Sequence, residues 1–271
     1  MLGELRDELI SSIQDNLSVI AEDYPIQKIG TVYEEVAGWS QALGICNLLL
    51  YADSDRFFEN LLRSGQTRRA FLSKCNAHGV TTDYQQAISR WESFFDVVAA
   101  DDLDIAQQIV TFSPKEWITD GEYEEDFCYY LFFHTIVAAP ASPDHASLKG
   151  ILDRFARALQ GAASLRFDIC QSFYTGDPDQ FGDAFNRLLL ERQAEMERDS
   201  QTGLADDMTF APRSQVFVEG LALLRMAERA GFEVEADYLF CPSLGRKPRL
   251  RPPPVDVYEE IDRSNASKAW P

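Results

Sequence analysis

Apolar residues recur at intervals of three and four along most of the chain, and this spacing constrains its fold more than any other feature. In residues 2–21, for example, Leu5, Leu9 and Ile13 stand on one face of a predicted amphipathic helix. No segment longer than a few residues alternates apolar and polar side chains in the way that a half-buried strand does. The sequence therefore predicts an all-α protein.

Proline, glycine and aspartate mark where the predicted helices begin and end. After the helix at 2–21, we expect helices at about 30–52, 53–62, 66–76, 84–99, 103–111, 119–140, 148–159, 162–174, 178–198 and 214–230, with a polar loop at 200–212. Consecutive helices that are joined by short breaks pack antiparallel. The chain should therefore be built from antiparallel helix pairs.

Three similar junctions indicate an internal repeat. Asp53, Asp101 and Asp177 each follow one apolar helix and precede the next, at separations of 48 and 76 residues. These separations fit one and about two helix-pair units of a helical solenoid. Aspartate also caps helices that belong to no repeat, which leaves a non-repeating helical globule as the alternative. We expect a repeat-like, solenoid-like array that forms a single body.

The composition changes near residue 246. Residues 1–245 are predicted to form a single all-helical domain, with a weak sub-boundary near 140–145, where residues 139–143 are Ala-Pro-Ala-Ser-Pro. Residues 246–271 are rich in proline and charge, and they begin with the basic run Arg-Lys-Pro-Arg-Leu-Arg-Pro-Pro-Pro. This composition predicts an extended C-terminal tail, which either wraps the domain or is disordered.

The net charge restricts the class of partner. The chain has 44 Asp and Glu against 25 Lys and Arg, a formal net charge of -19. Nucleic-acid binding is disfavoured because phosphate contacts need a basic surface. A basic protein partner is favoured because opposite charges accelerate association. The alternative is that the acidity only keeps the protein soluble.

The amino terminus and the cysteines indicate the compartment. The first ten residues carry acids and no uninterrupted apolar stretch, so they do not resemble a secretory signal. No apolar run approaches the ~18 residues needed to cross a bilayer. The five cysteines are an odd and scattered set, which fits reduced core residues better than a disulfide framework. We expect a cytoplasmic protein that does not bind membranes.

The sequence contains none of the familiar catalytic motifs. It has no phosphate-binding loop, dinucleotide fingerprint, zinc-protease helix, Cys-x-x-Cys pair or Gly-x-Ser-x-Gly turn. The three histidines lie far apart, and His134, on an apolar helix, is best explained as a hydrogen-bonded core residue. We therefore assign no catalytic residue, no metal ligand and no cofactor, and we predict that the protein is not an enzyme.

The segment 119–140 joins an acidic start to a strongly apolar run, and it is the predicted central helix. Thr119 and Glu122 have the spacing of a capping box, and Pro140 ends the helix. The acidic start has three explanations: a solvated helix start that the helix dipole favours, a surface that binds a partner, or a metal or acid–base site. Our candidate partner-binding residues are Glu122, Tyr123, Glu124, Glu125 and Asp126, together with Asp101 and Asp102.

Four further patterns occur in order along the chain. They are Leu-Leu-Leu-Tyr-Ala-Asp at 48–53 followed by Gln-Thr-Arg-Arg-Ala-Phe-Leu at 66–72, Gly-Glu-Tyr-Glu-Glu-Asp-Phe-Cys-Tyr at 121–129, Thr-Gly-Asp-Pro-Asp-Gln-Phe-Gly-Asp-Ala-Phe at 175–185, and Val-Glu-Gly-Leu-Ala-Leu-Leu-Arg-Met-Ala at 218–227 followed by Gly-Phe-Glu-Val-Glu at 231–235. Over roughly residues 30–243, this order resembles the immunity protein 49 family of bacterial polymorphic-toxin systems. The resemblance implies an all-helical, non-enzymatic cytoplasmic protein that binds and neutralises a cognate toxin domain, protecting the producing cell and its siblings.

Charge and resemblance agree on one mechanism. An acidic surface can occupy the basic cleft of a toxin that acts on nucleic acids, taking the place of the substrate phosphates. The main alternative is a helical-repeat scaffold that grips a peptide in a concave groove, without any toxin. A third possibility is an enzyme of an unfamiliar all-helical class.

Overall fold

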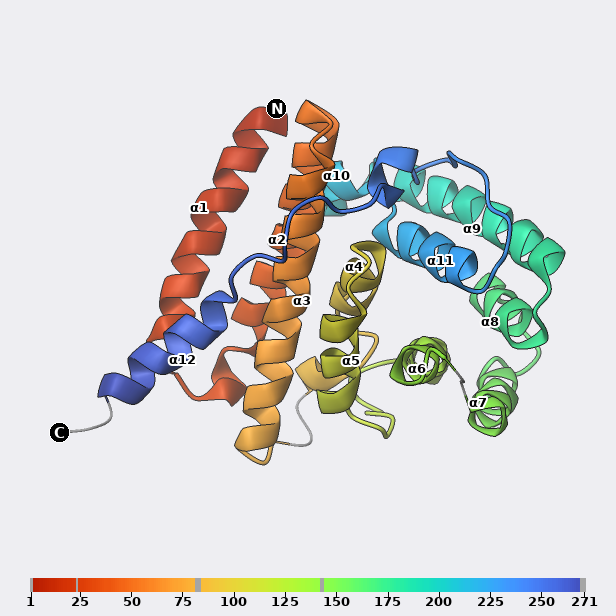
Figure 1. Cartoon of the computed structure of the whole chain (residues 1–271), viewed down its shortest axis with the longest axis horizontal. Helices are drawn as coiled ribbons and strands as arrows, with labels where there is room; N and C mark the ends of the chain where they lie inside the picture. The colour runs from red at the N-terminus through yellow and green to blue at the C-terminus, as the bar shows by residue number, and fades with distance from the viewer. Residues whose placement is uncertain (1, 23, 81–83, 142–143, 269–271) are drawn as a thin grey trace.

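The computed structural model describes residues 2–22, 24–80, 84–141 and 144–268 (Figure 1). Its α-helices are α1 (Leu2–Ala21), α2 (Gly30–Tyr51), α3 (Ser54–Ala77), α4 (Ser93–Ala99), α5 (Leu103–Phe112), α6 (Glu124–Ala138), α7 (His145–Ala158), α8 (Leu165–Thr175), α9 (Pro178–Asp199), α10 (Phe210–Arg213), α11 (Val218–Arg229) and α12 (Val257–Lys268). Within the described residues, β structure is limited to an isolated bridge between Tyr238 and Cys241. The predicted all-α class is confirmed.

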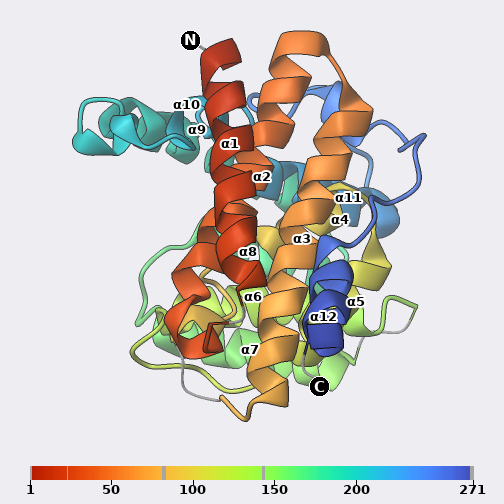
Figure 2. The same ribbon diagram turned by 90° about the vertical axis from the view of Figure 1, so that its left-hand side faces the viewer.

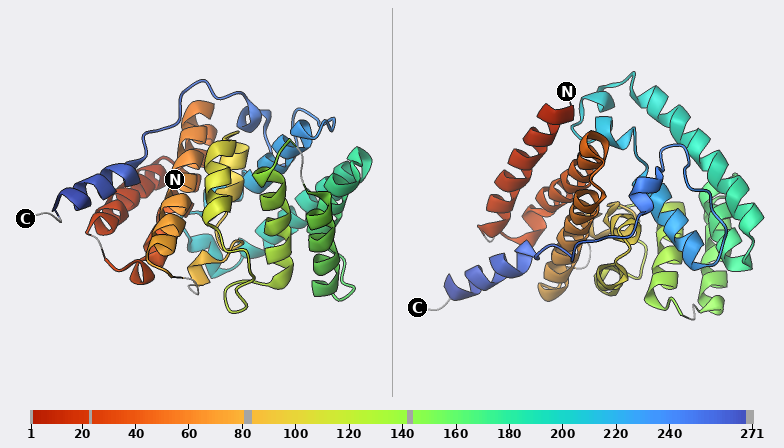
Figure 3. Two further views of the ribbon diagram at one scale, coloured as in Figure 1. Left: turned by 60° about the horizontal axis from the view of Figure 1, so that its bottom comes forward. Right: turned by 45° about the horizontal axis from the view of Figure 1, so that its top comes forward.

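Helices that follow one another in the chain also lie side by side. α2 packs between α1 and α3, α5 lies against α3 and α6, and α6 to α9 continue the series (Figure 1, Figure 3). α11 departs from this order, since it returns to pack on α4 near the centre of the molecule. α10 packs on α2, and α12 packs on α1 and α3. The result is the expected array of neighbouring helix pairs from α1 to α9, with α10, α11 and α12 as exceptions.

One continuous core joins both ends of the chain, from Ile20 in α1 to Tyr258 in α12. A smaller cluster of Leu9, Ala42 and Cys46 holds α1 against α2. All five cysteines are buried and free, as expected for reduced core residues. α6 and α7 pack against each other on the two sides of the sub-boundary predicted near 140–145, of which residues 142–143 lie outside the described residues.

α3 is one helix of 24 residues, not the two helices that we predicted. The serine and glycine near its centre do not break the helix. Their small side chains instead let α4 approach α3 closely. A Cβ atom at Gly65 would stand 2.0 Å from Cγ1 of Val97 in α4. Gly65 therefore serves packing, and it brings Ser64 within reach of α4.

The helix predicted at 84–99 is wrong in its first part, where a 3₁₀ turn (Tyr84–Gln86) and a loop precede α4. Arg68 of α3, only 2% exposed, reaches into this loop. Its guanidinium donates to the backbone oxygens of Gln85, Gln86 and Ala87 at 2.5, 2.9 and 2.8 Å. Because a side chain satisfies these acceptors, the segment does not need helical hydrogen bonds.

Capping explains the aspartates of the repeated junctions. The side chains of Asp53, Asp102 and Asp177 accept backbone hydrogen bonds at the starts of α3, α5 and α9. Asp101 has a different role, and its φ is positive at 60°. The polar loop predicted at 200–212 contains a 3₁₀ turn (Gly203–Asp206) and α10.

The C-terminal tail lies on the body of the protein, where it runs across α3 before α12 (Figure 1, Figure 2). The backbone N–H of Leu250 donates to Asp55 at 3.1 Å, and Arg249 lies 3.2 Å from Asp102. The extended conformation that we predicted holds for residues 247–256, which have no regular secondary structure. It is wrong for 257–268, which form α12, while residues 269–271 lie outside the described part.

α12 forms because its start is anchored to the core. The carboxylate of Asp256 accepts from the backbone N–H of Tyr258 at 3.0 Å. Tyr258 is 2% exposed, its hydroxyl lies 2.8 Å from that of Thr67, and its ring stacks on Tyr33 at 5.7 Å between centroids. Burial of one aromatic ring thus turns part of a polar tail into a docked helix.

Candidate functional site

α6 begins at Glu124, so the capping box predicted at Thr119 and Glu122 is wrong. The N-cap residue is Tyr123, whose side chain makes no capping hydrogen bond. Glu122 instead reaches the loop before α4, where its Oε2 accepts from N and Oγ of Ser89 at 2.9 and 2.7 Å. A contact with a distant residue has replaced the local cap. The rest of α6 is buried on several sides, as predicted.

Two acids in the first turn of α6 are paired with arginines of the same protein. Oε1 of Glu124 lies 2.8 Å from Nε of Arg154 in α7, and Oδ1 of Asp126 lies 3.0 Å from Nη1 of Arg166 in α8. Glu125 is half-buried and forms no ion pair within the part of the chain that the structure describes. These pairs reduce the charge that this surface presents to a partner.

The predicted partner-binding residues fall into two groups. The first, which we call the α6 acidic surface, consists of Glu122, Tyr123, Glu124, Glu125 and Asp126 at the amino end of α6. The second consists of Asp101 and Asp102 before α5. α5 begins beside the carboxyl end of α6, since Leu103 lines the same hollow as Ile136 and Val137. The length of α6, about 20 Å at ~1.5 Å per residue, therefore separates the two groups.

Both aspartates before α5 have partners. Oδ1 of Asp101 lies 2.6 Å from Nη2 of Arg229 at the end of α11, and each of these side chains is 46% exposed. Asp102 is buried, caps α5, and pairs with Arg249 of the tail. Asp101 is therefore the member of this group that a partner can reach.

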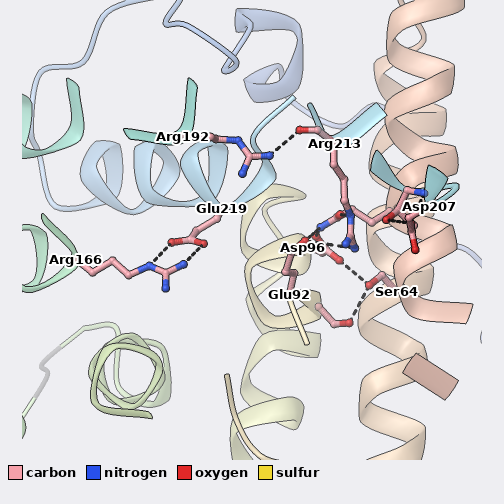
Figure 4. A network of polar contacts seen from close by, with 11 residues as sticks. Ser64, Glu92, Asp96, Arg166, Arg192, Asp207, Arg213 and Glu219 are labelled. Carbon is pink, nitrogen blue, oxygen red and sulfur yellow. Dashed lines mark hydrogen bonds and ion pairs between the residues drawn. The ribbon is translucent and has the colours of Figure 1, made fainter. Parts of the chain in front are cut away.

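Through Asp126, Arg166 connects the α6 acidic surface to a buried carboxylate of α11. Its guanidinium donates to both oxygens of Glu219, with Nη2 to Oε2 at 2.9 Å and Nε to Oε1 at 3.3 Å (Figure 4). Glu219 also accepts from the hydroxyl of Tyr129 at 2.8 Å. Burial raises the pKa of Asp126, although the positive charge of Arg166 opposes this shift. Arg166 thus joins α6, α8 and α11.

A second polar network surrounds Asp96 of α4, which is 1% exposed (Figure 4). Its Oδ1 accepts from Nε2 of Gln41 and its Oδ2 from Oγ of Ser64, both at 2.6 Å. Ser64 shares a further hydrogen bond with Ser93 at 2.9 Å. Burial raises the pKa of Asp96 to about 7, against these hydrogen bonds and the nearby Arg213. The carboxyl group therefore exchanges its proton near neutral pH.

The Asp96 network continues into the C-terminal half of the chain. Oε1 of Gln41 accepts from Nε of Arg213 at 2.6 Å, and Nη2 of Arg213 lies 3.4 Å from Oε2 of Glu92. The backbone oxygen of Arg213 accepts from Nη2 of Arg192 at 2.6 Å, and the Arg192 guanidinium lies 4.3 Å from the ring centre of Phe217. One series of polar contacts thus links α2, α4, α9 and α10.

Two hollows open along these networks and share Glu92 in their walls. The first has a volume of about 230 Å³ and the second about 610 Å³. Their charged lining residues are Glu34, Glu35, Arg90, Glu92, Asp96, Asp207 and Arg213 in the first, and Glu92, Arg166, Glu191, Arg192, Glu195, Arg198 and Glu219 in the second. Acids outnumber arginines in the first hollow, whereas the two signs of charge are nearly balanced in the second.

Apart from Asp126, the residues of these networks were not among the predicted site residues. One signal in the sequence could have indicated them, namely a single acid inside an apolar run. Asp96 stands in Phe-Phe-Asp-Val-Val, and Glu219 stands in the apolar segment 218–227. Such an acid must be paired or protonated when its helix is buried. The arginine partners come from distant helices and carry no comparable signal.

The position of His134 in the core is as predicted, whereas the hydrogen bond expected for its ring is not found at Nε2 in the part of the chain that the structure describes. His134 is 3% exposed, and its ring centre lies 4.3 Å from that of Phe94. Burial, together with the positive charges of Lys115 and Arg68, lowers its pKa to about 3, so the ring is neutral. Its Nε2 has no hydrogen-bond partner within the described residues. The described part of the chain also holds no group of three or more His, Cys, Asp or Glu side chains placed to bind a metal.

Among the described helices, none combines the length and the apolar character that a membrane span requires.

A family model matches most of the chain. The family is described as Immunity protein 49, and the match covers residues 50–244. These residues run from the end of α2 to the 3₁₀ turn (Ser243–Arg246) that precedes the tail, so α1, most of α2 and α12 lie outside the match. No curated protein and no solved structure matches the chain.

Proposed function

Because this chain belongs to the immunity protein 49 family, we propose that it binds and neutralises a cognate secreted toxin domain. The bound protein covers the active or substrate-binding surface of the toxin, and it protects the producing cell and its siblings from within the cytoplasm. It acts by occupying the toxin and not by turning over a substrate. The family match is the observation that carries this proposal.

The charge of the chain supports a basic toxin. At a net charge of -19, the protein attracts a positive partner over a distance set by the ionic strength. A toxin that acts on nucleic acids presents positive charge to phosphates, so an acidic protein can fill the same surface. Association should therefore be fast at low salt and slower as salt is added.

The predicted residues offer two candidate contacts at opposite ends of α6. On the α6 acidic surface, Tyr123 is 74% exposed and precedes Glu125 by two residues, and the charge of Glu125 is not neutralised by an ion pair of the described residues. An exposed aromatic side chain next to charge is typical of a binding hot spot. At the other end, Asp101 is exposed beside Arg229. We propose that the toxin contacts one of these two ends.

Growth rescue tests the function directly. The toxin domain encoded by the adjacent open reading frame is expressed with and without this protein, and the two are then co-purified. We expect restored growth and a stable complex. Continued toxicity and no complex would refute the proposed function. A scaffold that binds a different peptide would also leave toxicity unchanged.

Charge reversal tests the α6 acidic surface. Glu125→Lys is compared with Glu8→Lys, an exposed position in α1 that changes the net charge by the same amount. If the toxin binds at the α6 acidic surface, Glu125→Lys slows association more than Glu8→Lys and weakens its salt dependence. Equal effects of the two substitutions would exclude this surface.

A further inference from the structure

A third hollow, of about 420 Å³, lies at the carboxyl end of α6 and has mainly apolar walls. Its lining includes Leu103 of α5, Ile136 and Val137 of α6, Leu148 of α7, Phe173 of α8 and Met226 of α11. Leu103, Ile136 and Phe173 are only half-buried although five helices converge around them. The two hollows described above are lined largely by charged side chains, so this one differs in chemistry.

The arginine in the wall of this hollow already has a partner. Nη2 of Arg229 lies 2.6 Å from Oδ1 of Asp101, which stands at the entrance to α5. An arginine that is paired in this way is a poor receptor for an anionic ligand, because the ligand would have to replace the carboxylate. The half-buried apolar side chains of the hollow still face solvent. They would be stabilised by contact with an apolar group of a partner.

Two exposed aspartates adjoin lining residues in the sequence, and we take them as the rim of the hollow. Asp104 follows the lining residue Leu103, and Asp144 precedes the lining residue His145. Arg229 pairs with Asp101, and Lys149, which follows the lining residue Leu148, pairs with Asp153, so the charges of Asp104 and Asp144 remain. A basic partner therefore meets attraction at the rim and an apolar space at the centre, which is the usual layout of an interface hot spot.

We propose that this hollow receives a large apolar side chain of the toxin, and that a basic toxin residue beside it contacts the aspartates of the rim. This inference rests on the proposed function and assigns the contact to the carboxyl end of α6. The volume accommodates an aromatic or long aliphatic side chain. The α6 acidic surface lies about 20 Å away along the helix, so a substitution at one end does not alter the other.

Ala230→Trp tests the inference with little risk to the core. Ala230 is an exposed lining residue just after α11, so a tryptophan there fills the hollow without replacing a buried side chain. The matched control is Ala194→Trp, which places the same side chain at an exposed position of the 610 Å³ hollow. We measure the affinity of each variant for the purified toxin domain encoded by the adjacent open reading frame. We also measure the thermal unfolding midpoint of each variant.

We expect Ala230→Trp to weaken binding at least ~10-fold, while Ala194→Trp stays within about 2-fold of wild type. Glu125→Lys should then associate with the toxin at the same rate as its Glu8→Lys control. The inference is overturned if Ala230→Trp binds within about 2-fold of wild type, or if both tryptophan variants weaken binding equally.

If Ala230→Trp lowers the thermal midpoint, its weaker binding could result from a damaged fold. A second variant then tests the inference. Asp104→Lys reverses an exposed charge at the rim, and it should slow association more than Glu8→Lys. Association equal to that of Glu8→Lys would overturn the inference. If wild-type protein does not bind the toxin at all, the proposed function itself fails, which is a distinct result.

Discussion

Asp96→Asn should make the protein more stable at neutral and alkaline pH and should reduce the pH dependence of its stability. Asp96 is buried, and its carboxylate accepts hydrogen bonds from Gln41 and Ser64. An amide at this position can still accept from Gln41, and it can donate to the hydroxyl of Ser64, which is able to reverse its role. The substitution therefore removes the titration while the polar contacts remain.

The size of the effect follows from the pKa of Asp96 in the folded protein. That pKa is about 7, against an ordinary value of 3.8. Because the folded state binds the proton more tightly than the unfolded chain, the contribution of this group is complete below about pH 4 and is lost as the pH rises through about 7. At ~1.4 kcal/mol for each tenfold change in proton affinity, the full loss is roughly 4 kcal/mol.

Urea unfolding of wild type and Asp96→Asn between about pH 5 and about pH 8 measures this difference. The stability of the variant relative to wild type should rise by roughly 2 to 3 kcal/mol over that range. Asp104→Asn, at an exposed acid of α5, serves as the control and should show little change with pH. Parallel stability curves for wild type and Asp96→Asn would refute the reasoning.

Three further substitutions test the packing that supports the site. Gly65→Ala should lower the free energy of unfolding by about 1–3 kcal/mol, because its methyl group would collide with Val97, and urea unfolding will show whether it does. Glu219→Gln should cost about 2 kcal/mol in the same assay, less than for a fully buried pair because Arg166 is 36% exposed. Tyr258→Ala should release the tail from α3, which limited proteolysis detects as faster cleavage after residue 246. A cleavage rate equal to wild type would contradict the anchoring role of this ring.

The helices that could be predicted from the sequence are those whose apolar spacing alone defines them. α1, α2 and α9 begin and end within one or two residues of their predicted bounds. At residues 84–92 and at the start of α6, the predictions failed because a distant side chain supplies a hydrogen bond. Arg68 holds the carbonyls at 85–87, and Ser89 binds the carboxylate of Glu122. Neither contact is visible in a local pattern, because the partners meet only after α3, α4 and α6 have packed.

The acids of the α6 acidic surface can be recognised in the sequence, but their environment cannot. The acidic start of α6 is a local feature, whereas the arginines that pair with Glu124 and Asp126 come from α7 and α8. The separation of Asp101 from the α6 acidic surface depends on the direction in which α5 packs against α6. The apolar hollow beside Asp101 is built from five helices, and each contributes side chains that look like ordinary core residues in the sequence.

The most direct test of the account is a titration of the purified protein with the purified toxin domain from the adjacent open reading frame, at low and at physiological salt. Neutralisation by an acidic binding protein predicts a stable complex whose formation slows as salt is added, and loss of toxin activity in proportion to the complex formed. Absence of a complex, or a complex in which the toxin stays fully active, would contradict it.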